Sequence, residues 1–358
     1  MKMDSYAVPV TDDSWAVGTA STTTLFDWDY ADSREKMRSL YQKGKDRQWD
    51  AVKRIDWTRP IDHDNPLGVP DAFIPISSSR VWGKLTEKEK ANVRRHMAAW
   101  QFSQFLHGEQ GALICTAKIV QTVPDLDAKY YAGTQVMDEA RHVETYSRYI
   151  REKLELAYPI NPNLAILLEQ IVADSRWDFT YLGMQILIEG LALAAFGNIR
   201  DVATEPTARE VNAYVMQDEA RHVAFGRLAL RDYYPQLTEA ERREREEFTV
   251  DACYLMRDRF LGEEVWRNLD YDAAECMRHV KESELMKQFR GGLFMRIVPT
   301  LKDIGIWGPK IRAAFEDMGV MGFSTLDPDE GNRQDEAVAV ALERELHGAA
   351  TVDVDSAA

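Results

Sequence analysis

The same six residues, Asp-Glu-Ala-Arg-His-Val, occur twice in this chain, 80 residues apart, at Asp138–Val143 and at Asp218–Val223. Residues three apart lie on one face of an α-helix, so the glutamate and the histidine of each copy can bind one ion together. A single Glu-x-x-His is usually a solvated pair, but two identical copies predict two helices that share a metal site. The four side chains are Glu139, His142, Glu219 and His222.

A glutamate in an apolar stretch precedes each copy by the same 30 residues. These glutamates are Glu109, which precedes Glu139, and Glu189, which precedes Glu219. Burying a carboxylate among apolar side chains is costly unless a cation pairs with it. We therefore predict one centre of four glutamates and two histidines that holds two metal ions.

The 30-residue interval is the length of a helical hairpin that leaves the metal level and returns to it. Each arm would have 15 residues and span roughly 22 Å. Pro124 stands at the midpoint of the first interval, and Thr204 stands at the midpoint of the second, followed by Glu205-Pro206. Helix breakers therefore fall where two hairpins need their turns.

Composition narrows the class of protein. The chain has 358 residues, 45% of them apolar, which is ample for a large core in one or two domains. A net charge of −15 argues against nucleic acid or an anionic membrane as a main partner. The N-terminus lacks a signal peptide, and we find no run of about 18 apolar residues that could span a membrane, so we expect a cytoplasmic protein. Three scattered cysteines favour neither disulfides nor a zinc site.

Helical periodicity and capping signals predict an all-α fold with three parts. We expect an irregular, tryptophan-rich arm over residues 1–80, a helical domain over 81–325, and a mobile polar tail over 326–358. The domain would contain four ligand helices, a crossover at 158–175 with a short helix, and additional C-terminal helices. The ligand helices are expected at about 85–123, 126–156, 176–200 and 206–234. Later helices are expected from Thr238, from Asp272 and over 310–318.

One glutamate from each of two helices, with Glu-x-x-His from each of two others, is the pattern of the ferritin-like dimetal-carboxylate proteins. Over about 85–235 the chain resembles that superfamily. Its Asp-Glu-x-Arg-His form is similar to the hydroxylase subunits of bacterial multicomponent monooxygenases and, more distantly, to the small subunit of class I ribonucleotide reductase. The resemblance implies a ferritin-like four-helix bundle with the six ligands Glu109, Glu139, His142, Glu189, Glu219 and His222.

The resemblance also assigns roles around the ligands. Asp138 and Asp218 would each bond the histidine of the other half, since a metal-bound imidazole is oriented by the partner of its second nitrogen. Arg141 and Arg221 would join a buried polar network, although a surface position is an alternative for both.

The activity implied by the resemblance is O2-dependent oxidation. Oxygen and nitrogen ligands without thiolate suit iron, and a manganese–iron pair is an alternative. Two iron ions with O2 as co-substrate would hydroxylate or N-oxygenate a small organic molecule. The chain has no flavin, nicotinamide or iron–sulfur fingerprint, so we expect an external electron donor, a ferredoxin or a reductase. The arm would wrap either the core or a second copy in a homodimer.

Departures from the relatives leave the reaction open. Leu193 stands where the multicomponent hydroxylases have a threonine. Val215 stands where p-aminobenzoate N-oxygenases have an additional histidine ligand, which counts against a close match to those enzymes. Tyr146 occupies the position of the radical tyrosine of the ribonucleotide reductase small subunit, so a radical-generating protein is an alternative. Iron storage is a further alternative, which the long arm and extra helices disfavour.

The repeat predicts an asymmetric site. The counterpart of Tyr146 under the 80-residue offset is Gly226, so one side carries a ring and the other almost nothing. One hypothesis is a substrate cavity at Gly226, beside Phe225 and with Leu193 as another wall. The alternative is that Gly226 only permits close packing of two helices.

Overall fold

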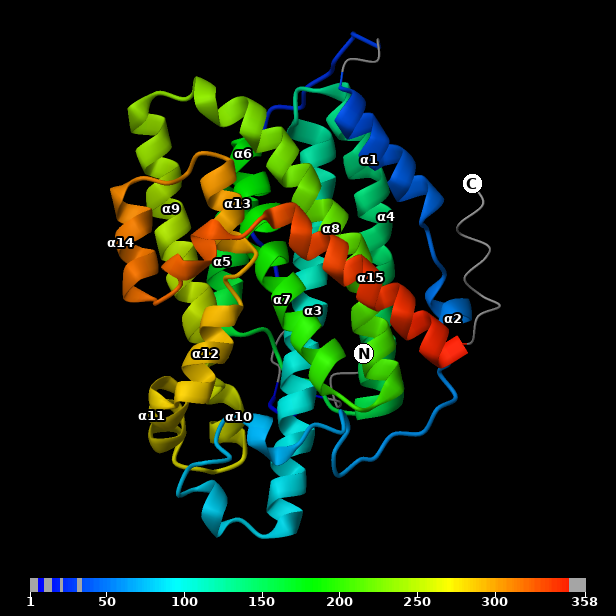
Figure 1. The fold of residues 1–358 in the computed structure, drawn as a ribbon, viewed down its shortest axis with the longest axis vertical. Helices are drawn as coiled ribbons and strands as arrows, with labels where there is room; N and C mark the ends of the chain where they lie inside the picture. The colour runs from blue at the N-terminus through cyan, green and yellow to red at the C-terminus, as the bar shows by residue number, and fades with distance from the viewer. Residues whose placement is uncertain (1–5, 10–14, 20–21, 31–33, 348–358) are drawn as a thin grey trace.

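The computed structural model describes residues 6–9, 15–19, 22–30 and 34–347. These residues contain no strand, only an isolated bridge between Tyr6 and Ala157. The four central helical segments are α3 (Glu87–Thr122), α4 (Leu126–Tyr149), α7 (Glu189–Val202) and α8 (Pro206–Tyr233). Around them lie the other helices (Figure 1), namely α1 (Glu35–Asp46), α2 (Ala51–Arg54), α5 (Pro162–Ala173), α6 (Trp177–Thr180), α9 (Glu239–Asp258), α10 (Glu263–Asn268), α11 (Ala273–Glu282), α12 (Glu284–Gly292), α13 (Ile297–Asp303), α14 (Pro309–Asp317) and α15 (Pro328–His347).

The two predicted hairpins are present, because α3 packs on α4 and α7 packs on α8. Local capping sets their ends. Thr86 forms a capping box with Glu89 at the start of α3, and the Asp125 side chain accepts a hydrogen bond at the start of α4. Pro206 opens α8 at a position where a missing N–H costs nothing. The turns fall at residues 123–125 and 203–205, as the 30-residue interval predicts.

The segment Trp177–Val202 is helical throughout, but its middle is a π-helix, η5 (Tyr181–Ile188), which ends directly before Glu189. An 18-residue window of this segment has a mean hydropathy of 1.5, which makes it the one described helix long and apolar enough to cross a membrane, so the expectation that the chain has no such run was wrong. The protein buries 94% of this window, as a core helix requires. π-Helical segments are rare and often occur at functional sites.

The arm is more regular than expected. It contains α1, which packs on α4 and α8 at the upper right of Figure 1, and the short α2. The Asp50 side chain caps α2 by accepting from two backbone N–H groups. The polar composition around these helices concealed them, because their inward faces carry few large apolar side chains.

The predicted mobile tail was also wrong as far as residue 347. α15 crosses α8 (Figure 1), and its Ala339 and Leu342 pack on Ala213. The spacing of three residues puts both apolar side chains on one helix face. Arg200 and Arg296 also pair with Asp335 of α15. Residues 348–358 lie outside the described part of the chain.

Candidate metal centre

Each central helix contributes to one buried cluster at mid-bundle. Glu109 lies on α3 and Glu189 on α7, while α4 and α8 each bring a Glu-x-x-His pair. None of the six predicted side chains is more than 5% exposed. The helices therefore bring together all six residues that the repeat and the 30-residue interval select.

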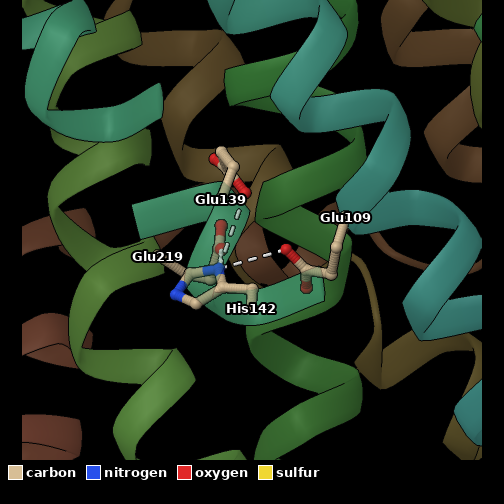
Figure 2. A group of neighbouring side chains, drawn as sticks. All are labelled: Glu109, Glu139, His142 and Glu219. Carbon is tan, nitrogen blue, oxygen red and sulfur yellow. Dashed lines mark hydrogen bonds and ion pairs between the residues drawn. The ribbon is translucent and has the colours of Figure 1, made fainter. Parts of the chain in front are cut away.

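The first half of the cluster surrounds His142. Its Nδ1 atom lies 3.1 Å from Glu109 Oε2, 3.1 Å from Glu219 Oε1 and 3.5 Å from Glu139 Oε2. Figure 2 shows the three carboxylates converging on this nitrogen from three helices. Ligand atoms of these four residues all lie within 4.8 Å of one another, a spacing that one metal ion can bridge.

The second half surrounds His222. Its Nδ1 atom lies 3.1 Å from Glu139 Oε1 and 3.4 Å from Glu219 Oε2. Glu139, Glu189 and His222 form a second group of ligand atoms within 4.8 Å. Glu139 and Glu219 each approach both histidines, so these two carboxylates lie between the two halves of the site.

The cluster fits two cations and is poorly satisfied without them. Among the described residues, both Glu219 oxygens, Oε2 of Glu139 and of Glu189, and His222 Nδ1 are buried without a hydrogen-bond partner. Burial and the charge of Glu219 raise the pKa of Glu109 and of Glu189 well above the usual range. Two divalent ions would balance the charge of four carboxylates, and the oxygen and nitrogen donors suit iron or manganese.

The histidines are oriented by the aspartates of the opposite half. His142 Nε2 lies 3.0 Å from Asp218 Oδ2, and His222 Nε2 lies 3.3 Å from Asp138 Oδ2. The cross-half contacts that the resemblance implied are therefore present. Each aspartate accepts from Nε2, which holds that nitrogen as the N–H and leaves Nδ1, which faces the carboxylates, available to a metal ion bound between them.

Two arginines complete this network. Arg141 Nη2 donates to both Asp138 and Asp218, the second at 2.8 Å, and Arg221 donates to Asp218. Both arginines are at most 7% exposed, so the surface alternative for them was wrong. Burial alone would raise the pKa of Asp218, but Arg221, His142 and Arg141 outweigh it and hold that pKa well below the usual range.

The N-terminal arm seals this network, a role that the sequence interpretation missed. Trp49 Nε1 donates to Asp218 Oδ2 at 2.8 Å, and Gln48 Nε2 donates to Asp138 Oδ1 at 2.7 Å. Both residues lie about 90 or more positions from their partners. No spacing rule links residues so far apart, and only the generic enrichment of tryptophan in the arm drew attention to it.

The two halves of the repeat carry different residues one helical turn before each Glu-x-x-His. In the first half Gln135 Nε2 donates to Glu139 Oε1 at 2.9 Å and to Glu189 Oε1 at 3.0 Å. In the second half the equivalent residue is Val215, which is fully buried and has no donor to offer. Glu219 therefore keeps both oxygens free for metal, while Glu139 is held by an amide.

Tyr146 lies deep in an aromatic group beside the centre. It is fully buried, its hydroxyl donates to Asn212 Oδ1 at 3.2 Å, and its ring packs against Phe102, Phe105 and Phe196. Burial and the negative Glu109 and Glu219 raise its pKa well above 10. The tyrosine is therefore protonated and hydrogen-bonded at neutral pH.

The hypothesis of a substrate cavity at Gly226 was wrong. A Cβ atom on Gly226 would lie 2.6 Å from Gln185 Cβ in η5, so the glycine permits close helix packing. Phe225 is fully buried between the rings of Tyr131 and Tyr181. Leu193 borders a space of only about 10 Å³ that adjoins none of the six predicted ligands.

The cavity that reaches the centre lies between α3 and α7 instead. It has a volume of about 30 Å³, and three of the four glutamates form part of its wall. Its lining consists of Gln104, Phe105, Gly108, Glu109, Ala112, Ile188, Glu189, Ala192, Phe196, Glu219 and Arg259. The carboxylate wall faces apolar rings, an arrangement that keeps bulk water from reacting atoms.

A four-helix core with four buried glutamates and two cross-oriented histidines defines a ferritin-like dimetal-carboxylate protein. Residues 30–305 match the family described as P-aminobenzoate N-oxygenase AurF. The chain belongs to this family, so the inference from Val215 against a close match to the p-aminobenzoate N-oxygenases was wrong. It is an O2-dependent oxidoreductase whose cofactor is a pair of metal ions.

Solved structures agree with this fold. Two single-residue variants of an R2-like ligand-binding oxidase, each with an anaerobically reconstituted Mn/Fe cofactor, superpose with a TM-score of 0.50. They are 18% and 17% identical in sequence, and each comparison covers 77% of this chain and 96% of the other. No match was found among curated proteins.

Proposed function

We propose that this protein transfers oxygen to the nitrogen of a small organic amine, using two iron ions bound by Glu109, Glu139, His142, Glu189, Glu219 and His222. Membership in the AurF family supports this reaction. The observation that carries the proposal is the cavity between α3 and α7. Three candidate ligands form its wall, so a molecule in it would touch the metal centre directly.

The side chains of the centre have separate roles in the proposed reaction. When bound, the two ferrous ions supply electrons to O2, and the protein supplies geometry and a dry pocket. Asp218 and Asp138 keep the Nε2 protons in place, so that both Nδ1 atoms face the carboxylates. Phe105 and Phe196 pack edge-to-face with ring centroids 4.7 Å apart. They exclude water from the cavity that Glu109 borders.

Val215 favours a second candidate, hydroxylation at carbon. The N-oxygenases that the chain resembles have a histidine ligand at this position, and a buried valine cannot replace it. The second half of the centre would therefore have one nitrogen ligand fewer and a different reactivity. The product of the reaction distinguishes the two candidates.

The test is a single-turnover reaction with labelled oxygen. Protein reconstituted anaerobically with Fe²⁺ is mixed with 4-aminobenzoate and a chemical reductant, exposed to 18O2, and the products are analysed by mass spectrometry. We expect the label on nitrogen. Label on a ring carbon would favour the second candidate, and unlabelled product or turnover equal to that of metal-free protein would contradict both. Glu189→Ala serves as the matched inactive variant.

We also propose a protein partner for electron transfer. A separate electron donor, a ferredoxin or a reductase, would reduce the metal centre between turnovers. A cytoplasmic location and a homodimer stay predictions.

A further inference from the structure

Arg259 is a buried cation without a counter-ion. It lies on the turn η7 (Arg259–Leu261) after α9 and is 8% exposed. Within the described part of the chain its guanidinium makes no hydrogen bond or ion pair, and its one contact of note is the ring of Phe260 at 4.8 Å. Burial lowers its pKa to about 10, so it stays charged at neutral pH. A buried charge without a counter-ion is expensive, so a cation at this position needs an explanation.

Other buried arginines near the core have partners. Arg141 and Arg221 bind the two aspartates of the metal centre, and Arg245 binds Asp178 through two nitrogens. Two divalent ions would balance the four glutamates, and the two aspartates balance the two arginines. Arg259 has no carboxylate partner of this kind, and unlike Arg290 and Lys153, which donate to backbone carbonyls, it has no carbonyl partner either among the described residues.

The side chain of Arg259 borders the cavity beside the metal centre. It lines the same 30 Å³ cavity as Glu109, Glu189 and Glu219, so a cation and the metal-binding carboxylates border one space. The next residue, Phe260, lines a larger cavity of about 140 Å³.

The larger cavity lies next to the smaller one along α3 and α7. It borders Gln101 on α3 and Ile199 on α7, each about one turn from Phe105 and Phe196 of the inner cavity. The two spaces therefore lie in sequence along the α3–α7 interface, and η7 borders both.

We propose that Arg259 anchors the anionic group of the substrate, and that the substrate reaches the metal centre through the larger cavity. The inference deepens the proposed function and rests on it for the reacting group. A guanidinium presents two parallel N–H donors that match a carboxylate. The inner cavity holds about two water molecules, so binding must displace the ring of Phe105 or Phe196. The reacting amine would then lie at the glutamate wall with the anion at Arg259.

Binding of matched anionic and neutral compounds tests this role. Calorimetry would compare 4-aminobenzoate with 4-aminobenzamide, and benzoate with benzamide, on metal-loaded wild-type protein, Arg259→Gln and Arg259→Lys. We expect wild-type protein to prefer each carboxylate by on the order of 10- to 100-fold, as for a hydrogen bond to a charged group. Arg259→Gln should lose this preference, and Arg259→Lys should keep part of it.

Thermal unfolding separates anchoring from a structural role. Arg259→Gln removes an unpaired charge, so its Tm should equal or exceed that of the wild type. The matched control Arg245→Gln breaks a buried pair and should lower Tm. A preference for carboxylates that survives in Arg259→Gln, a wild type that binds neither member of a pair, or a lower Tm for Arg259→Gln would overturn the proposal. Because binding requires no turnover, failure of N-oxygenation alone would leave this result standing.

Discussion

Asp218 joins the metal centre to the rest of the protein, and its replacement by asparagine should separate metal binding from folding. Its carboxylate accepts from Trp49 Nε1 at 2.8 Å, from Arg141 Nη2 at 2.8 Å and from Arg221, and it orients His142. An asparagine side chain has only one acceptor oxygen. At the position of the other carboxylate oxygen its NH2 group would face N–H donors and could not accept from them.

The magnitude follows from this geometry. Removing one charge from a buried pair costs about 3–5 kcal/mol, and the similar shape of asparagine places the loss near 3 kcal/mol in the free energy of unfolding. Weakening the outer partner of a metal-bound histidine typically costs about 10- to 100-fold in metal affinity. Asp218→Asn should therefore show both losses.

Asp178→Asn is the matched control. Asp178 is equally buried and accepts from Arg245 Nε at 3.0 Å and Nη2 at 3.2 Å, but it does not belong to the cluster of candidate ligands. Urea unfolding of the metal-free proteins should show similar destabilisation of both variants. Titration with Fe²⁺ against a chelator should show weaker binding for Asp218→Asn alone. Equal iron affinity in Asp218→Asn and wild-type protein would refute the reasoning.

Three further predictions concern single positions. Gly226→Ala should lower the free energy of unfolding by about 1–3 kcal/mol through overpacking, whereas Gly133→Ala, with nothing within 4 Å of its Cβ, should raise it by about 0.5–1 kcal/mol; urea unfolding measures both. Gln135→Met removes the amide donor to two glutamates and should weaken iron binding about tenfold in a chelator titration. Burial, aided by Arg95, lowers the pKa of His96 from 6.5 to about 4. The unfolded chain therefore binds the extra proton between these values, so stability should fall as pH drops from 6.5 to 4, and His96→Asn should flatten that decline in pH-dependent unfolding.

The ligand helices were predictable because their signals are local. The capping box at Thr86, the breaker at Pro124 and the proline at Pro206 mark ends that the structure places within a few residues. The Glu-x-x-His spacing and the 30-residue interval then bring six side chains to one level. Helical periodicity alone accounts for that part of the site.

The features that distinguish this site were not predictable, because they depend on distant packing. Trp49 and Gln48 reach the aspartates from the arm, and Arg259 reaches the cavity from a turn after α9. Gly226 was ambiguous because its meaning depends on the path of η5, and a π-helix has no reliable sequence signature. α15 was missed because its packed face is short, with only Ala339, Leu342 and Leu346 in a segment that is otherwise mostly polar.

The central claim is that the six side chains hold two metal ions between them. Crystals of the iron-loaded protein, measured at the iron absorption edge, test it directly through anomalous scattering. We predict two peaks per chain, about 3.5–4 Å apart, one beside His142 Nδ1 and the other beside His222 Nδ1, with Glu139 and Glu219 between them. A single peak, or iron located away from these residues in protein that retains activity, would contradict it.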